Sequence, residues 1–349
     1  MSEIPVAKTE ECEKAEDLIH ALRPRSDHFK DLHSSIARTQ EYIFRGHRDD
    51  RFELVPSALR LNALIKSRFG SGTWGTVELN HEDQTKERFL EARERLPVTD
   101  NWLNRDQIRA EMLMLADFFQ FADASGLPLP EDSRDLRQSL EEWLVSFTEM
   151  YRENNEKSGL SWPPSKLLSV IALAQHYGIP TRLLDWTRSS YIGAYFAASG
   201  AVQSTNSKAT HLSVWAFNCE AYKVSTILKL APETVKIITA PSAGNPNLHL
   251  QKGLFTIYQP ESLQPGGRVD RTPLERALQR NSVAPLFIRF RLPVSQANKL
   301  LRLLFLEGGI TCSVYAGYQG AAQATMEQVH WDNWDRPGDI WQNVPSSED

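Results

Sequence analysis

The sequence predicts an α+β fold with a mixed or antiparallel sheet as its core and an inserted helical subdomain over about residues 62–160. Two observations predict this fold class. Apolar side chains recur at helical spacing over residues 108–122 and 133–151, whereas apolar and polar residues alternate in the second half of the chain, as they do in half-buried strands.

The first 40 residues are predicted to form an N-terminal helical extension, with a helix over about residues 9–22. A strand follows, because residues 42–44 are good strand formers and Gly46 ends the run. Arg45 lies at the end of this strand, where an ion pair with a neighbouring carboxylate or an anionic ligand would explain it. Three more arginines in the same region favour the anion, namely Arg48, Arg51 and Arg60.

The pattern between residues 62 and 160 is helical. Residues 82–96 are charged and solvated, whereas Ser133 caps a helix with one apolar face that continues to Tyr151. Residues 70–75 match the pattern G-x-G-x-x-G, but they follow a basic segment and not an apolar strand. We therefore interpret them as a surface loop.

The densest group of polar and aromatic side chains lies at residues 173–196. A helix capped by Ser165 ends before Pro180, which imposes an extended segment, and Ser189 or Ser190 caps the next helix. Polar groups held between two buried elements need partners or a ligand. The sequence therefore predicts a site in this stretch.

The second half of the chain is rich in predicted strands. Alternation or apolar runs indicate strands at residues 211–217, 235–239, 254–258 and 286–292. A capping box at residues 272–275 and a Leu-rich segment over residues 295–309 predict two helices. The Trp-rich acidic tail, residues 327–349, either packs back on the domain or contacts a partner.

Composition restricts the class of protein. The 349 residues carry a net charge of −5, which argues against general nucleic-acid or membrane-surface binding. A polar N-terminus and the lack of a long apolar run indicate a cytoplasmic protein without a membrane segment. The three cysteines are too scattered for a zinc site and His176 lacks partners at ligand spacing, so no metal is expected.

Several of these motifs resemble the FRG domain family. The triplet that gives the family its name is found at residues 44–46, and its longest signature at residues 174–187, followed by a Tyr-Phe-Ala helix at residues 195–197. Weaker matches lie at residues 56–60, 111–118, 251–255 and 309–311. The resemblance covers about residues 41–326 and leaves the first 40 residues and the tail outside.

The order of these motifs is similar to that of ADP-ribosyltransferases, and this likeness implies a split sheet and NAD as the substrate. Arg45 would then hold the NAD pyrophosphate with help from Arg182, and residues 181–187 would position the nicotinamide ribose. A nearby aromatic ring would stack on the nicotinamide. The expected ligand-binding residues are Arg45, Gly46, Tyr177, Thr181, Arg182, Trp186 and Thr187.

Transfer of ADP-ribose passes through a transition state that resembles an oxocarbenium ion, which an adjacent anion stabilises. Where the transferases place a glutamate on a late strand, this chain has Gln251, which can hydrogen-bond a ribose hydroxyl but cannot stabilise a cation. Asp185 is the best substitute carboxylate, although an ion pair with Arg182 would explain it equally well. His176 completes the predicted catalytic set; a hydrogen bond to the backbone at a helix end is the alternative.

Three functions stay open. The first is an NAD-dependent ADP-ribosyltransferase or NAD glycohydrolase in a toxin or defence system, with an unknown macromolecular acceptor. The second, motivated by Gln251, is a non-catalytic sensor that binds a nucleotide or another phosphate-bearing small molecule. The third is a protein-interaction module that uses the Trp-rich tail. Both ligand hypotheses expect Arg45, His176, Arg182 and Asp185 to converge on one cleft.

Overall fold

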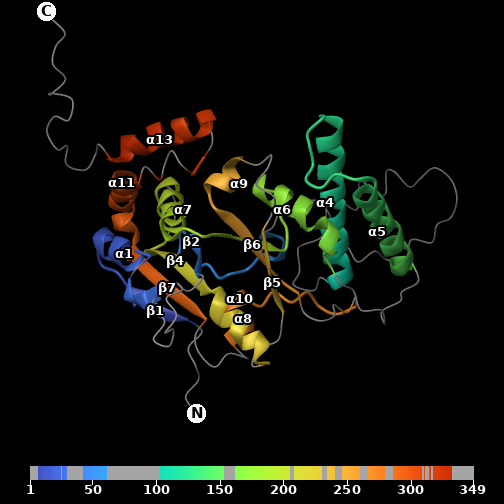
Figure 1. Ribbon diagram of the computed structural model, residues 1–349, viewed down its shortest axis with the longest axis horizontal. Coiled ribbons are helices and arrows are strands. Elements are labelled where there is room, and N and C mark those ends of the chain that lie inside the picture. The colour runs from blue at the N-terminus through green and yellow to red at the C-terminus, as the bar shows by residue number, and fades with distance from the viewer. Residues whose placement is uncertain are drawn as a thin grey trace, which may run out of the picture.

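The architecture is seen in a computed structural model of the chain (Figure 1). The structure describes residues 7–24, 26–29, 42–60, 103–152, 162–204, 208–229, 234–239, 246–259, 264, 266–279, 286–308, 310, 314–315 and 317–331. The predicted loop at residues 70–75, the predicted helix at residues 82–96 and the tail beyond Trp331 lie outside the described residues.

A 7-stranded mixed sheet forms the core, in the order β1-β7-β4-β2-β3-β6-β5. Neighbouring strands are antiparallel except β1 and β7, which are parallel. The predicted α+β class with a mixed sheet is therefore confirmed. The strands are β1 (Lys8–Glu11), β2 (Tyr42–His47), β3 (Leu183–Thr187), β4 (His211–Asn218), β5 (Val235–Ile238), β6 (Gly253–Tyr258) and β7 (Phe287–Pro293).

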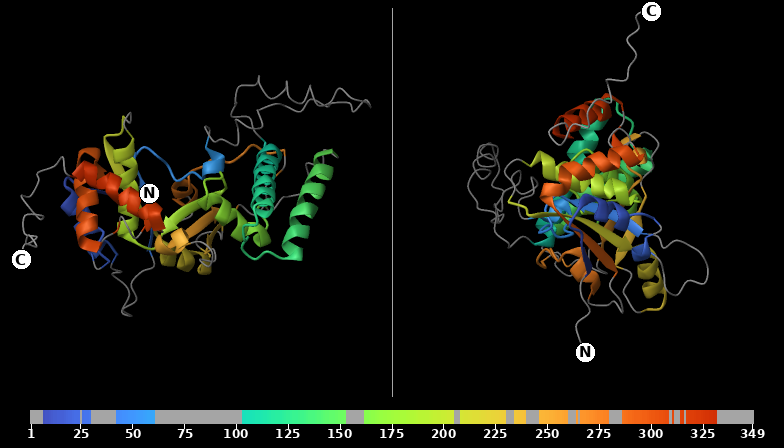
Figure 2. Two further views of the ribbon diagram at one scale, coloured as in Figure 1. Left: turned by 90° about the horizontal axis from the view of Figure 1, so that it is seen from above. Right: turned by 90° about the vertical axis from the view of Figure 1, so that its left-hand side faces the viewer.

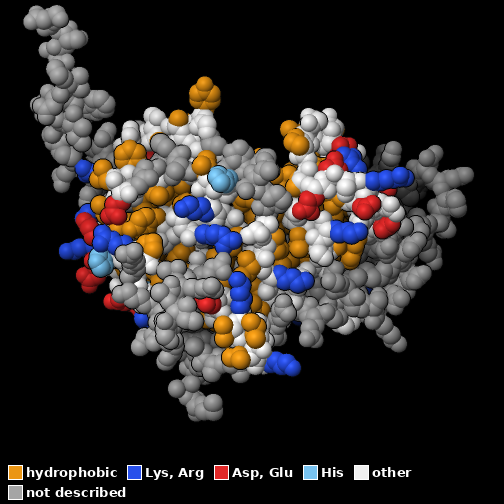
Figure 3. Space-filling model, viewed as in Figure 1, with side chains coloured by type: hydrophobic (Ala, Val, Ile, Leu, Met, Phe, Trp, Pro, Cys, Tyr) orange, Lys and Arg blue, Asp and Glu red, His pale blue; other side chains and the backbone are white. Residues whose placement is uncertain are grey.

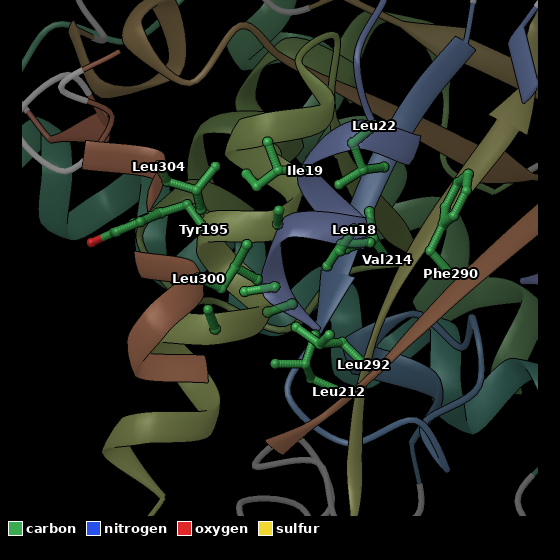
Figure 4. Packing of buried hydrophobic residues seen from close by; sticks show 14 of the residues in the cluster. Leu18, Ile19, Leu22, Tyr195, Leu212, Val214, Phe290, Leu292, Leu300 and Leu304 are labelled. Carbon is green, nitrogen blue, oxygen red and sulfur yellow. The ribbon is translucent and has the colours of Figure 1, made fainter. Parts of the chain in front are cut away.

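One face of the sheet is covered by α1, α7 and α11, which bury an apolar cluster against β2, β4 and β7 (Figure 4). Leu18, Tyr195 and Phe290 lie in this cluster and are fully buried. The C-terminal α13 packs against α11, and its Glu327 carboxylate accepts a 2.6 Å hydrogen bond from the Tyr195 hydroxyl. These helices are α1 (Ala15–Ala21), α7 (Ser190–Gln203), α11 (Ala297–Gly308) and α13 (Gly317–Trp331).

The opposite face of the sheet packs on α8 and α10. Successive strand residues point to opposite faces, and Val214 belongs to the first apolar cluster whereas Trp215 belongs to a second one on this face. Outward-facing apolar side chains of α8 form an orange group at the bottom of Figure 3. The two helices are α8 (Cys219–Ile227) and α10 (Leu274–Gln279).

The helical region predicted over residues 62–160 is described at α4 and α5, which lie at the end of the molecule away from α11 and α13 (Figure 2). A third apolar cluster joins α4 and α6 to β3 and β6. The remaining helices are α4 (Asn104–Ala124), α5 (Arg134–Arg152), α6 (Leu168–His176), α9 (Pro246–Leu250) and the short 3₁₀ turns Asp27–Phe29, Ser57–Leu59, Ser165–Leu167 and Val294–Gln296. No described helix has the length and apolar composition needed to cross a membrane.

The prediction of one helix over residues 9–22 is wrong at its start. Residues Lys8–Glu11 form β1, which pairs in parallel with β7, and the helix is confined to Ala15–Ala21. The charged sequence of this segment suits a helix, but pairing with the open edge of β7 determines its conformation. The four strands predicted in the second half of the chain are confirmed as β4, β5, β6 and β7.

Gly46 allows β2 and α7 to approach each other closely. A Cβ atom at this position would collide with the Gly193 carbonyl oxygen and would lie 2.6 Å from the Ala197 amide nitrogen. We expect Gly46→Ala to lower the free energy of unfolding by about 3 kcal/mol or more, because backbone cannot move aside as a flexible side chain can. Urea denaturation measures this effect.

Gly200→Ala is the matched control, because its Cβ would meet the Arg48 side chain at 3.2 Å, a tight contact but not a collision with backbone. A Gly46→Ala variant as stable as Gly200→Ala would contradict the packing argument.

Glu275 is a buried carboxylate on α10. It is 3% exposed and accepts a 3.2 Å hydrogen bond from the Leu54 amide. Burial raises its pKa to about 6, above the value of 4.5 for an unfolded glutamate. The ionised form therefore destabilises the fold, with the full cost present above pH 6 and absent below pH 4.5.

We expect wild type to gain about 2 kcal/mol relative to Glu275→Gln when the pH falls from about 7.5 to about 4.5. Paired urea titrations at the two pH values measure the difference. An identical pH dependence in wild type and variant would contradict the assignment.

Candidate functional site

A pocket of about 390 Å³ is lined by the middle of β2 and by the last three residues of β3. The last turn of α6 supplies one wall through Gln175, His176 and Tyr177, and α7 supplies Phe196. The segment from α9 into β6 closes a third side. The pocket thus lies between α7, which belongs to the first apolar cluster, and α6, which belongs to the third.

The floor of the pocket is a gap between two strands. β2 and β3 share one register pair, Phe44 with Thr187, and diverge beyond it. Arg45 bridges the gap, and its Nη1 atom donates to the Asp185 backbone oxygen at 2.7 Å and to the Asp185 carboxylate at 2.7 Å. The guanidinium therefore satisfies a strand carbonyl that lacks a ladder partner there.

Asp185 is paired and yet open to the pocket. Its other carboxylate oxygen accepts from Gln175 Nε2 at 3.0 Å, and the Gln175 oxygen in turn accepts from the Thr181 hydroxyl at 2.7 Å. The Asp185 side chain is 57% exposed, whereas that of Arg45 is 12% exposed. The carboxylate is thus held in a fixed position with one side free for a ligand.

Electrostatics keep this carboxylate ionised. Desolvation in the pocket alone would raise the pKa of Asp185, but the Arg45 charge and the hydrogen bonds from Arg45 and Gln175 lower it to about 2. Burial lowers the pKa of His176, against the opposing effect of Asp185, so this imidazole is neutral at pH 7. The pocket therefore offers one anion, one guanidinium and one neutral imidazole.

His47 orients the Arg45 side chain through a hydrogen bond. The Arg45 Nε–H group donates to His47 Nε2 at 3.0 Å, so that nitrogen carries no proton, and Nδ1 donates to the Phe52 carbonyl at 3.1 Å. Burial and the Arg45 charge lower the pKa of His47 to about 3, which keeps the ring neutral. The tautomer that orients Arg45 is therefore fixed at physiological pH.

A second guanidinium lies near the site. Arg60 Nε donates to the Val55 carbonyl at 3.0 Å. Partial burial and the charge of Arg45 lower the pKa of Arg60, while Asp185 raises it, which places all three groups within electrostatic reach. With two guanidinium groups and one carboxylate, the charge around the floor favours an anionic ligand group.

Comparison with known proteins identifies the central part of this structure. Residues 40–206 match the model of the FRG domain family. The chain contains an FRG domain. No curated protein and no solved structure matches the chain.

The stretch that matches the FRG family supplies only part of the pocket. β2, α6, β3 and α7 lie within the matched residues, whereas Leu248, Gln251 and Tyr315 lie beyond them. The chain beyond residue 206 is therefore needed to complete the walls.

Most of the residues singled out from the sequence do meet at this pocket. Those that line it are Arg45, Gly46, His176, Tyr177, Asp185, Trp186, Thr187 and Gln251. Tyr177 is 63% exposed at the rim, where its ring is accessible to a ligand. Gln251 precedes β6 instead of lying in it; its backbone oxygen accepts from the Thr187 hydroxyl at 2.7 Å, and its Nε2 atom donates to the Val314 carbonyl at 3.3 Å.

Trp186 contributes no stacking ring. Its side chain is 3% exposed in the cluster on the opposite face of the sheet, and its indole nitrogen donates to Thr256 at 2.8 Å. The reason is strand alternation, which sends Asp185 and Trp186 to opposite faces.

Two of the expected ligand residues do not line the pocket. Arg182 is buried and its Nε atom donates to both carboxylate oxygens of Glu111, at 2.9 and 2.8 Å. Thr181 supports the site indirectly through Gln175. Arg45, His176 and Asp185 therefore converge on one cleft without Arg182, and the suggested Arg182–Asp185 pair is replaced by the pair of Arg45 with Asp185.

Sequence reasoning missed His47, the role of Gln175 and the contribution of Tyr315. His47 follows Gly46 directly, and its i+2 spacing from Arg45 in a strand puts both side chains on one face. This spacing could have revealed His47 as a partner of Arg45. Tyr315 reaches the pocket from the C-terminal part of the chain, and no local pattern marks it.

Proposed function

We propose that the pocket binds NAD and cleaves the bond between nicotinamide and ribose, as an ADP-ribosyltransferase or NAD glycohydrolase does. The observation that carries the proposal is the Asp185 carboxylate, which is ionised, fixed by Arg45 and Gln175, and 57% exposed within a pocket that has Tyr177 at its rim. Departure of nicotinamide leaves positive charge on the ribose, and a preorganised anion stabilises that charge.

The other groups of the pocket suit the rest of the dinucleotide. Among the described residues, Arg45 Nη2 has no hydrogen-bond partner, so it is available to a pyrophosphate oxygen, with Arg60 adding positive charge. The exposed ring of Tyr177 suits stacking on nicotinamide. His176, being neutral, can hydrogen-bond a ribose hydroxyl.

A specific observation favours a second candidate function, a sensor that binds the nucleotide without cleaving it. Gln251 occupies the place where the likeness to ADP-ribosyltransferases expects a glutamate, and Asp185 is the single carboxylate among the described residues that line the pocket. Part of the Asp185 charge is balanced by Arg45 at 2.7 Å. Such a site would still bind the nucleotide, but it would stabilise a ribosyl cation less well than a site with an unpaired carboxylate.

Release of nicotinamide from NAD by the purified protein tests the proposal, with and without cell lysate as a source of acceptor. We expect release by wild type and its loss in Arg45→Ala, because that change removes the guanidinium that fixes Asp185. Arg51→Ala is the control; its side chain is 63% exposed and pairs with Asp49, and it does not line this pocket.

The outcomes separate the two candidates. Release that is lost in Arg45→Ala and kept in Arg51→Ala supports the enzyme, and dependence on lysate indicates a macromolecular acceptor. Arg45-dependent stabilisation by NAD without release supports the sensor. If NAD is neither cleaved nor stabilises the protein, both candidate functions are contradicted.

A further inference from the structure

A second pocket of about 330 Å³ lies on the face of the sheet that packs on α8 and α10. Its lining comes from the edge strand β1, the loop at residues 50–53, Trp215 of β4, Arg289 of β7, and Glu275 and Arg276 of α10. These elements are far apart in the sequence and are brought together by the pairing of β1 with β7 and of β7 with β4.

Most charges around this second pocket are already paired within the chain. The ion pairs are Arg51 with Asp49 at 2.6 Å, Arg276 with Glu53 at 2.6 Å, and Arg291 with Asp50 at 2.7 Å. Two lining residues have no ion-pair partner among the described residues, namely Arg289 and Glu275. One unmatched cation and one unmatched anion therefore face the same cavity.

Arg289 has few contacts for a guanidinium group. Its Nη1 atom makes one long contact of 3.5 Å to the Asp50 carbonyl, and its buried Nε–H group has no acceptor among the residues that the structure describes. The guanidinium lies over the Trp215 ring, 5.4 Å from its centroid. The indole N–H of Trp215, a residue only 3% exposed, likewise finds no acceptor in the described part of the chain. Buried donors without partners are rare in folded proteins and indicate a place where a ligand or water supplies the acceptor.

Glu275 is the acidic residue of this pocket that could pair with a cationic group of a ligand. Its carboxylate is 3% exposed and accepts from the Leu54 amide, and no cation within the described part of the chain forms an ion pair with it. Arg276 is paired with Glu53, and its charge opposes the effect of burial on the pKa of Glu275 without cancelling it. A buried charge without a counter-charge is costly, and a ligand that brings a cation to it is bound more tightly for that reason.

We propose that this second pocket binds a small zwitterion of the amino-acid type. The ligand carboxylate pairs with Arg289, its protonated amine pairs with Glu275, and its apolar part lies against Phe52, which is 43% exposed and lines the cavity. The volume suits a small molecule. Three acidic and three basic residues line the pocket, a balance that disfavours a polyphosphate and favours a ligand with no net charge.

The proposal does not depend on the function assigned to the first pocket. Its test is binding, measured by thermal shift and isothermal titration of the full chain with each of the twenty L-amino acids separately. For the amino acid that binds best, the matching amine without the carboxylate and the matching acid without the amine are titrated at the same concentrations.

Two variants remove the two charges with little change in shape, Arg289→Met and Glu275→Gln. Tyr177→Ala is the control, because it alters the rim of the first pocket and leaves the second one intact. We expect saturable binding of at least one amino acid by wild type and by Tyr177→Ala, and at least about tenfold weaker binding in each charge variant.

Three results would overturn the proposal: no binding by any of the twenty amino acids, equal binding of the amine or the acid analogue, or undiminished affinity in both charge variants. Because the analogue series uses wild type, the test holds even where a variant fails to fold. Equal stabilisation by inorganic phosphate would show a general anion site and would also overturn it.

Discussion

Glu111→Ala is expected to destabilise the protein by about 3–5 kcal/mol, because it leaves the buried Arg182 guanidinium without a counter-charge. Glu111 is 7% exposed and accepts hydrogen bonds from three side chains, those of Arg182, Gln107 at 2.8 Å and Trp162 at 2.7 Å. It thereby ties α4 to the segment before α6 and to the start of β3. Urea denaturation followed by circular dichroism measures the loss.

Glu141→Ala is the matched control, since Glu141 lies exposed on α5. Its effect should stay within about 0.5 kcal/mol. The double variant Glu111→Met with Arg182→Met should be more stable than Glu111→Ala, because no buried charge is left alone. If Glu111→Ala proved as mild as Glu141→Ala, the central role of this carboxylate would be contradicted.

Asp185→Asn is expected to lower the rate of nicotinamide release by about 100-fold or more while NAD affinity stays within a few-fold of wild type. Asparagine has the shape of aspartate and can still accept from Arg45, but it has no charge with which to stabilise a ribosyl cation. Steady-state kinetics of nicotinamide release separate the two effects as a change in kcat with little change in KM.

The control for Asp185→Asn is Asp123→Asn, an equal chemical change in an exposed ion pair with Arg137. Full turnover in Asp185→Asn would exclude Asp185 as the catalytic anion, whatever the affinity for NAD.

Local sequence patterns predict the strands and helices well where the core determines the pattern. Alternation in residues 211–217 and 286–292 corresponds to β4 and β7, where successive side chains enter the apolar clusters on the two faces of the sheet. The pattern fails at Lys8–Glu11, since a short charged segment carries no information about the free edge of β7 some 280 residues later.

The candidate site shows the same division between local and distant information. Arg45 and Asp185 are conspicuous in the sequence, but their pairing depends on the divergence of β2 and β3, which no local pattern encodes. From the sequence, Arg182 is a candidate phosphate-binding residue. In the structure it pairs with Glu111, which lies 71 residues earlier. Which arginine pairs with which carboxylate is therefore determined by the tertiary structure.

Isothermal titration of NAD into the Asp185→Asn variant tests whether the first pocket is an NAD site, because cleavage does not complicate the heat of binding there. We expect saturable binding of one NAD per chain, and binding at least about tenfold weaker once Arg45→Ala is added, because the pyrophosphate loses its guanidinium. No binding to Asp185→Asn, or equal affinity with and without Arg45, would contradict the assignment of this pocket to NAD.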